Sequence, residues 1–182
     1  MAGQIKDAVF AGGCFWCLEA PFDALDGVIE TTPGYTGGAT SNPTYEDVSS
    51  GQSGHVEAVR IVYDESRISF EKLLSVFWRN IDPTDSGGQF CDRGPQYTSA
   101  IFVADEIENL AARQSKHELE TAKGMVVVTE IRPRSGFYPA EEYHQDYYRK
   151  NPIRYRFYRQ GCGRDIRLRQ VWGDEAGGKP SD

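Results

Sequence analysis

Hydrophobic and polar residues alternate along residues 55–63, and this two-residue period is typical of a β-strand. Val56, Ala58 and Val62 fall on one face of the expected strand. Glu57 falls on the other face, among apolar neighbours. The pattern therefore predicts a partly buried carboxylate within a strand.

Two longer segments instead repeat their hydrophobic residues at helical spacing. Apolar side chains recur every third or fourth residue over residues 69–80, which predicts an amphipathic helix. Residues 105–124 predict a longer helix, because Asp105 and Glu108 have the spacing of a capping box and Gly124 favours a helix end. Shorter runs predict strands over residues 8–11, 27–32, 98–104 and 125–131, and helices over residues 14–25 and 139–150.

Two stretches rich in glycine, proline and small polar residues, 33–54 and 82–96, predict long loops. Because the first joins two strands without a helix, the order of elements does not fit a doubly wound sheet. We expect an α+β fold with a two-layer mixed sheet and flanking helices, that is, an α/β plait with a ferredoxin-like core. Residues 1–182 are expected to form a single domain, in which residues 159–182 are a loop-rich, flexible C-terminal tail.

The 182 residues suffice for one domain with its own core, and 39% of them are hydrophobic. The formal net charge of −7 argues against nucleic-acid binding, which needs an excess of lysine and arginine. Residues 149–169 differ, since they hold eight basic residues and one acidic residue; they predict a solvated basic face or, alternatively, a docking surface for an acidic partner. No apolar run is long enough to cross a bilayer and residues 1–7 lack the apolar core of a secretory signal, so we expect a cytoplasmic protein without membrane contact.

The four cysteines, Cys14, Cys17, Cys91 and Cys162, have no regular spacing, which disfavours the disulfide framework of a small secreted protein. A structural zinc site normally uses two close pairs of ligands, and only Cys14 and Cys17 are close here. We therefore expect no metal site, although a zinc or structural-thiol domain remains an alternative. Redox chemistry or buried, inert thiols are the remaining interpretations.

Cys14 follows an expected strand and two glycines, and it opens an expected helix. The helix dipole and free backbone N–H groups at such a position lower the pKa of a thiol. The position predicts a nucleophile, whereas the alternative is a small buried hydrophobe. The neighbouring Phe15 and Trp16 either line an apolar pocket for a small alkyl group or belong to the core. Cys14-x-x-Cys17 taken alone suggests a thioredoxin-like dithiol.

The string Gly13-Cys14-Phe15-Trp16-Cys17-Leu18-Glu19 resembles the signature of the peptide methionine-S-sulfoxide reductases, the A-type enzymes. Further segments that are similar to this family follow in family order, and the resemblance covers the chain from Val9 to Gly163. These segments are Gly34-Tyr35-Thr36-Gly37-Gly38, Asn42-Pro43-Thr44-Tyr45, Gly54-His55-Val56-Glu57-Ala58-Val59, Asp82-Pro83-Thr84, Asp92-Arg93-Gly94-Pro95-Gln96-Tyr97 and Tyr143-His144-Gln145.

The resemblance implies an enzyme that reduces the S epimer of methionine sulfoxide, protein-bound and free, and so repairs oxidised proteins. Cys14 is then the nucleophile, which becomes a sulfenic acid and later a disulfide. Phe15 and Trp16 hold the terminal methyl group of the substrate. Glu57 protonates the sulfoxide oxygen, for which burial must raise its pKa from about 4.3. No bound cofactor is implied, and the reductant is an external thiol, either thioredoxin or a small dithiol.

The resemblance also implies that Tyr35 and Tyr97 donate hydrogen bonds to the sulfoxide oxygen, and that Asp92 helps to organise the pocket. His55 and His144 have no metal-ligand spacing, so we expect them to be core or hydrogen-bonding residues.

The thiol that resolves the sulfenic acid is expected to be Cys162, which lies between two glycines near the C-terminus, where the family places resolving cysteines. Cys17 and Cys91 remain alternatives. The chain departs from the family pattern here, because many members have glycine at the position of Cys17 and carry two C-terminal cysteines. The alternative function is that of a general thiol–disulfide oxidoreductase using Cys14 and Cys17.

Overall fold

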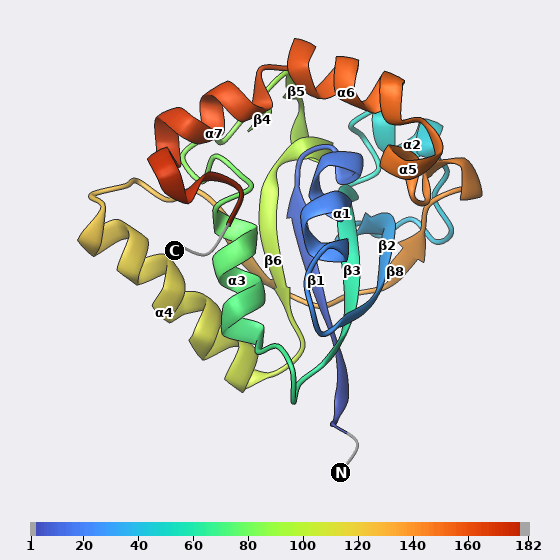
Figure 1. The fold of residues 1–182 in the computed structure, drawn as a ribbon. Coiled ribbons are helices and arrows are strands. Elements are labelled where there is room, and N and C mark those ends of the chain that lie inside the picture. The colour runs from blue at the N-terminus through green and yellow to red at the C-terminus, as the bar shows by residue number, and fades with distance from the viewer. Residues whose placement is uncertain (1–2, 179–182) are drawn as a thin grey trace.

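The computed structural model describes residues 3–178, and its centre is a six-stranded sheet (Figure 1). The strands lie in the order β7-β6-β1-β3-β2-β8. Their bounds are β1 (Ile5–Gly12), β2 (Val28–Thr36), β3 (Val56–Asp64), β6 (Ser99–Val103), β7 (Glu130–Pro133) and β8 (Phe137–Pro139). A separate small sheet pairs β4 (Gly88–Gln89) with β5 (Asp92–Arg93).

The sheet is mixed. Strand β1 runs antiparallel to both of its neighbours, β3 and β6, and β3 runs antiparallel to β2. At the edges, β8 is antiparallel to β2, whereas β7 is parallel to β6. The α-helices are α1 (Phe15–Asp23), α2 (Tyr45–Ser49), α3 (Phe70–Trp78), α4 (Glu106–Ala122), α5 (Tyr147–Lys150), α6 (Pro152–Gly161) and α7 (Arg164–Trp172). Short 3-10 helices are η1 (Pro95–Tyr97), η2 (Glu142–His144) and η3 (Gly173–Gly178).

The main core lies between the sheet and the helices that cover one of its faces. The ring of Phe10 in β1 stacks on Phe22 of α1 and Phe77 of α3, with ring centroids 5.6 and 4.9 Å apart. Both helices pack against β1, and α4 packs against α3 (Figure 1). Burial of these large rings drives the association of helices and sheet, at about 2–3 kcal/mol for each fully buried ring. The expected α+β fold with a mixed sheet and flanking helices is confirmed.

The two amphipathic helices form where the sequence predicts them, because their caps are present. The side chain of Ser69 accepts a hydrogen bond from the amide of Lys72 at the start of α3. The side chain of Asp105 accepts a hydrogen bond from the amide of Glu108 at the start of α4. Each cap satisfies a backbone donor that the first helical turn leaves free.

Four elements differ from the expectation. The predicted loop over residues 82–96 contains β4, β5 and the start of η1. The predicted strand over residues 125–131 forms only from Glu130 onward, as β7. The predicted helix over residues 139–150 is broken, because Pro139 ends β8 and only η2 and α5 follow. The predicted loop over residues 33–54 contains the end of β2 and the short helix α2, which begins with a capping box at Thr44.

The expectation of a loop-rich C-terminal tail is wrong for the described part of residues 159–182, which ends at residue 178. These residues hold the end of α6, all of α7 and η3. Leu168 and Trp172 of α7 are buried, and the indole Nε1 of Trp172 donates a hydrogen bond to the carbonyl oxygen of Ile81 at 2.9 Å. Because Leu168 and Trp172 lie among several arginines, the sequence of α7 shows no clear amphipathic pattern. Their burial nevertheless packs the helix against the rest of the fold. Residues 179–182 lie outside the described residues.

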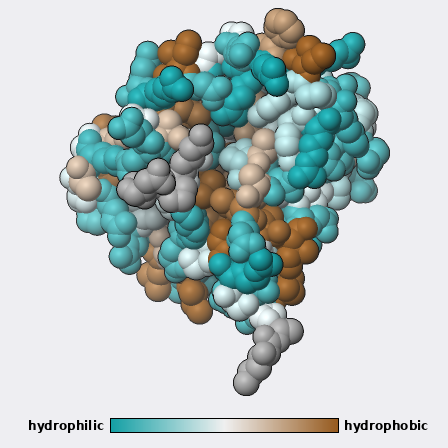
Figure 2. Space-filling model, viewed as in Figure 1, coloured by the Kyte–Doolittle hydropathy of each residue, from teal (hydrophilic) through white to brown (hydrophobic). Residues whose placement is uncertain are grey.

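Hydrophilic residues cover most of the face in Figure 2, and hydrophobic residues appear there in separate patches. The exposed large hydrophobic side chains include Ile153 and Phe157 of α6. Within residues 3–178, none of the helices combines the length and the hydropathy that a bilayer crossing requires.

Candidate active site

Cys14 lies at the turn where β1 ends and α1 begins. The preceding residue, Gly13, has a φ of +81°, and a Cβ there would lie 2.6 Å from the Cβ of Gln89, so this turn requires glycine. Cys14 is the N-cap residue of α1, and 6% of its surface is exposed. The structure thus confirms that this cysteine follows a strand and opens a helix, where the first amides of the helix are free.

The thiols of Cys14 and Cys17 hydrogen-bond to each other, and both are free and buried. Burial raises the pKa of Cys14 well above its ordinary value. The hydrogen bond from Cys14 lowers the pKa of Cys17 to about 6, and the positive charges of Arg164 and Arg159 act in the same direction. The expected lowering of the pKa at Cys14 is therefore not met, because burial opposes it, and the two thiols titrate as a coupled pair.

Glu57 lies on β3 beside these thiols and is 4% exposed. Its Oε2 accepts a hydrogen bond from the backbone amide of Phe15 at 3.0 Å. Burial raises the pKa of Glu57 to about 8, and the negative charges of Asp92 and Cys17 raise it further against the opposing effect of the amide. Most of the carboxyl group is consequently protonated at neutral pH, which is the state that a proton donor requires.

The two aromatic residues after Cys14 have different surroundings. Phe15 is 1% exposed and packs against Tyr35 and His144, with ring centroids 5.8 and 5.0 Å apart. Trp16 is only partly buried and stacks on Tyr147 at 3.8 Å. The Nε1 of Trp16 donates a hydrogen bond to the Nδ1 of His144 at 3.1 Å. Phe15 is thus part of the core beneath the site, whereas the partly buried ring of Trp16 forms one wall of the site.

The side chains of Tyr97 and Tyr45 interact with each other, and burial raises the pKa of both. Ionisation of Glu57 or Cys14 raises the pKa of both phenols, so the two tyrosines lie near the site. Tyr35 lies opposite Glu57 in the β2–β3 pair, but its hydroxyl donates a hydrogen bond to the Oε1 of Glu141 at 3.0 Å.

Sequence reasoning therefore missed Tyr45. A usable signal was present, because Thr44 and Asp47 form a capping box that starts a helix at Tyr45 and so fixes its backbone position.

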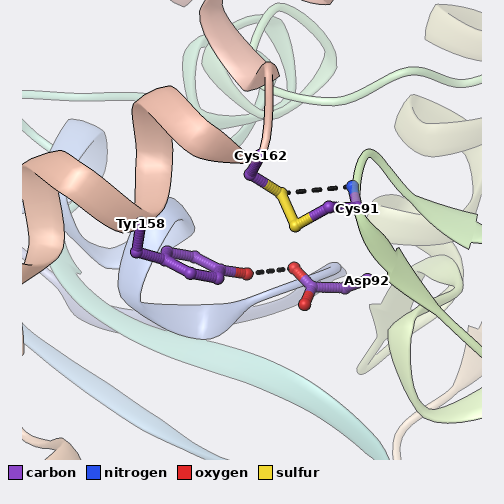
Figure 3. Close-up of a disulfide and its surroundings, with 4 residues drawn as sticks. All are labelled: Cys91, Asp92, Tyr158 and Cys162. Atoms are coloured by element: carbon purple, nitrogen blue, oxygen red, sulfur yellow. Dashed lines mark hydrogen bonds between the residues drawn. A yellow bond between two sulfur atoms is a disulfide. The ribbon is translucent and has the colours of Figure 1, made fainter.

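Asp92 is half-buried on β5, and burial raises its pKa. Figure 3 shows the ring of Tyr158 in α6 directed at this carboxylate, to which its hydroxyl donates a hydrogen bond. Trp16 meets the edge of the same ring, with centroids 5.7 Å apart. Tyr158 thus connects Asp92 to the wall of the site, a contact that sequence reasoning also missed.

Cys91 and Cys162 form a disulfide directly above this contact, with Cα atoms 4.9 Å apart (Figure 3). The bond joins the β4–β5 hairpin to the end of α6, and the amide of Cys91 donates a hydrogen bond to the Sγ of Cys162 at 3.1 Å. Cys91 is exposed. With Asp92, the two sulfurs are close enough to hold a metal ion, but a disulfide does not offer the thiolate ligands that zinc requires. The absence of a metal stays a prediction.

The largest cavity described, about 620 Å³, lies between α3 and α4 and is lined by none of these residues. The candidate site is instead the closely packed region around Cys14, at the start of α1. Glu57, Tyr97 and Asp92 lie there as expected, together with Cys17, Tyr45 and Tyr158.

Residues 6–176 match the family model of peptide methionine sulfoxide reductase. The chain is 49% identical over 175 residues to peptide methionine sulfoxide reductase MsrA 2 of Rhizobium meliloti, covering 96% of this chain and 87% of that protein. The chain belongs to the peptide methionine sulfoxide reductase family.

Solved structures of this family have the same fold. Reduced Mxr1 from Saccharomyces cerevisiae is 32% identical and superposes with a TM-score of 0.78, covering 82% of this chain and 87% of that one. Mxr1 in complex with Trx2 is 25% identical, with a TM-score of 0.57, and the match covers 79% of this chain and 85% of that one. Membership of the peptide methionine sulfoxide reductase family, expected from the motifs around Cys14, is confirmed.

Proposed function

We propose that this protein reduces the S epimer of methionine sulfoxide, in proteins and as the free amino acid, with thiols as the source of electrons. The observation that carries the proposal is the protonated Glu57, held by the amide of Phe15 beside the Cys14–Cys17 pair. A thiol nucleophile with a neutral carboxylic acid next to it fits a substrate whose oxygen must be protonated before it can leave.

In the first step, the sulfur of Cys14 gives its proton to the thiolate of Cys17 and attacks the sulfoxide sulfur. Glu57 supplies a proton to the sulfoxide oxygen, and Tyr45 and Tyr97 donate hydrogen bonds to it. The protonated oxygen passes from the substrate sulfur to the sulfur of Cys14: the substrate sulfur–oxygen bond breaks and a new one forms to Cys14. The transient bond between the two sulfurs breaks at the same time, so methionine leaves and Cys14 becomes a sulfenic acid. The substrate sulfur gains two electrons and the sulfur of Cys14 loses two, so no other oxidant or reductant takes part.

The substrate methyl group then belongs against the ring of Trp16, with Phe15 supporting the wall from below. Because Trp16 stacks on Tyr147 and meets the edge of Tyr158, these three rings form an apolar enclosure at the start of α1. Asp92 keeps Tyr158 in this position through its hydrogen bond. Tyr35, whose hydroxyl is bound to Glu141, supports Phe15 rather than the substrate oxygen.

We further propose that Cys17 is the first thiol to react with the sulfenic acid, since its side chain already contacts Cys14. The condensation forms a Cys14–Cys17 disulfide and releases water. Cys162, the expected resolving residue, acts in the next step: with Cys91 it takes over the disulfide by thiol exchange. The free inner pair, Cys14 and Cys17, and the bonded outer pair, Cys91 and Cys162, support this order of exchange.

The exposed Cys91 makes the outer disulfide accessible to a protein dithiol. The solved complex of Mxr1 with Trx2 supports a thioredoxin as this reductant. The protein needs no bound cofactor in this scheme, because each electron pair passes through sulfur atoms. We further propose that the protein acts in the cytoplasm, where thiol reductants keep protein dithiols reduced.

We also propose that the fold is built on a ferredoxin-like core. The four central strands have the order β6-β1-β3-β2, and all neighbouring pairs among them are antiparallel. Helix α1 lies between β1 and β2 in the chain, and α3 lies between β3 and β6. This βαββαβ arrangement supports the proposal.

The deciding experiment measures turnover of the separate S and R epimers of a methionine sulfoxide peptide, with a small dithiol as the reductant. The S epimer should be reduced and the R epimer should not, and Cys14→Ser should abolish the reaction. Equal reduction of both epimers would contradict the proposal.

A general thiol–disulfide oxidoreductase remains the second candidate, because the Cys14–Cys17 pair has the hydrogen-bonded form of a reactive dithiol. Glu57→Gln separates the two functions. It should stop sulfoxide reduction but leave any reduction of insulin disulfides unchanged, since disulfide exchange requires no acid for a sulfoxide oxygen.

A further inference from the structure

Arg164, the first residue of α7, is one of the largest fully buried side chains, with 1% of its surface exposed. Its Nη2 donates hydrogen bonds to the carbonyl oxygens of Gly12 and Asn80, at 3.1 and 2.8 Å. Its Nε is buried and has no hydrogen-bond partner. Among the ion pairs of residues 3–178, none includes Arg164, so no carboxylate oxygen lies in direct contact with its charge, although that charge acts on the carboxylate of Asp92 and opposes the rise of its pKa.

The guanidinium group lies between the two cysteine pairs. Its Nη1 is 3.7 Å from the position that a Cβ of Gly13 would take, and Gly13 precedes Cys14. Its Cζ lies 4.4 Å from the ring centroid of Phe90, which precedes Cys91. Arg164 itself follows Cys162 by two residues. The side chain therefore reaches from the outer disulfide to the turn that carries the nucleophile.

A buried cation without an anion is unfavourable, because carbonyl dipoles replace only part of the lost hydration. A nearby thiolate removes this cost, and the cation in turn stabilises the thiolate. The charge of Arg164 acts directly on Cys17 and lowers its pKa.

The other ionisable groups around the thiols do not offer the same counter-charge. Glu57 is mostly protonated, and Asp92 is negative and opposes a thiolate. Arg159 also faces Cys17, donating to its carbonyl oxygen at 3.4 Å, but its charge is already paired with Asp165 at 2.7 Å. The remaining groups that face the pair are the phenols of Tyr45, Tyr97, Tyr155 and Tyr158.

We propose that Arg164 is the counter-cation of the Cys14–Cys17 pair and holds the negative charge from which the attacking thiolate is formed. It acts as a positioning residue, since its contacts are with backbone and with Phe90 rather than with the reacting atoms. The inference deepens the proposed function, but the ionisation of the thiols is measurable without any sulfoxide.

The test is the pH dependence of alkylation by iodoacetamide, followed by mass spectrometry of the peptide that carries Cys14 and Cys17. Without added reductant the outer disulfide stays closed, so only the inner thiols react. In the unaltered protein, the midpoint of alkylation should lie below the value of about 8.5 for an ordinary thiol. A midpoint at or above that value would overturn the proposal even if no variant folds.

Arg164→Met should raise this midpoint by about one pH unit or more, because it removes the buried charge. Arg164→Lys should keep most of the shift, since it retains the charge and loses only the planar fork. Arg169→Met, which removes an exposed arginine of the same helix, is the matched control and should leave the midpoint unchanged. Circular dichroism checks that each variant is folded.

An unchanged midpoint in folded Arg164→Met, or an equal rise in Arg164→Met and Arg169→Met, would overturn the inference. Turnover of the S epimer by the unaltered protein is measured in parallel. If that turnover is present while Arg164→Met keeps the normal midpoint, the inference fails and the proposed function stands. If the unaltered protein does not reduce the S epimer, the proposed function fails, whatever the alkylation shows.

Discussion

The backbone amide of Phe15 donates a hydrogen bond to the Oε2 of Glu57 at 3.0 Å, which fastens strand β3 to the first turn of helix α1. The same amide is one of the free N–H groups that a helix leaves at its start. Because the amide of Phe15 donates to Oε2, the acidic proton of Glu57 is carried by the other carboxyl oxygen. A single contact thus satisfies the helix and orients the acid beside Cys14.

Replacing Glu57 by glutamine tests this arrangement. The glutamine side chain keeps an oxygen that can accept the hydrogen bond from the backbone N–H of Phe15, but it has no acidic proton. Turnover of the S epimer should therefore fall by about 10²-fold or more. Alkylation of Cys14 should continue, because the thiols remain in place. Glu130→Gln, at an exposed position of β7, is the control and should retain full activity. Full activity in Glu57→Gln would exclude this residue as the proton donor.

The raised pKa of Glu57 predicts how activity and stability change with pH. Turnover should decline as the pH rises through about 8, where the acid loses its proton. The folded state holds this proton more tightly than the unfolded state, whose value is near 4.5. The contribution to stability is therefore fully present below about pH 4.5 and is lost as the pH rises towards about 8.

Urea denaturation of the unaltered protein and of Glu57→Gln, at several pH values between 5 and 9, measures the stability effect. The variant should show a smaller loss of unfolding free energy over this range. Glu19 is also buried, with a pKa raised to about 7 by burial, but it is present in both proteins and cancels in the difference. Identical slopes for the two proteins would contradict the raised pKa of Glu57.

Sequence patterns predicted the parts of the site that depend on local structure. The two glycines before Cys14 and the alternation around Glu57 each report on the backbone next to them, and the structure places both residues accordingly. The direction of Tyr35 could not be predicted in this way. It depends on Glu141, a residue more than a hundred positions away that lies against the same sheet edge.

The C-terminal region shows the same limit more strongly. Its helices are held by contacts between distant segments, such as Trp172 with Ile81 and Tyr158 with Asp92. Such contacts leave no periodic pattern in a short, arginine-rich helix. The pairing of Cys91 with Cys162 likewise follows from the approach of α6 to the β4–β5 hairpin, and cysteine spacing alone does not specify connectivity.

Two tyrosine variants test the reassignment of the phenols at the site. Tyr45→Phe should lower turnover of the S epimer about tenfold or more, because it removes a hydrogen-bond donor to the sulfoxide oxygen. Tyr35→Phe should have a smaller effect on turnover, since it removes only the hydrogen bond to Glu141. Initial rates at saturating substrate measure both. If turnover falls more in Tyr35→Phe than in Tyr45→Phe, Tyr35 rather than Tyr45 is the hydrogen-bond donor to the sulfoxide oxygen.

The last prediction concerns the order in which the cysteines act. Cys91→Ser removes the outer disulfide but leaves the inner pair intact, so one equivalent of methionine should still form rapidly when reduced enzyme meets the S epimer without reductant. Steady-state turnover with thioredoxin should fall, because the exposed partner of Cys162 is absent.

Cys17→Ser should also form one equivalent of methionine, but the product enzyme should then carry a sulfenic acid that dimedone traps. In Cys91→Ser the Cys14–Cys17 disulfide should form instead and exclude dimedone. Rapid quench and mass spectrometry distinguish these products. If Cys17→Ser instead forms a Cys14–Cys162 disulfide as fast as the unaltered protein forms its first disulfide, the sulfur of Cys162 reaches Cys14 directly. The inner pair would then be unnecessary for resolution.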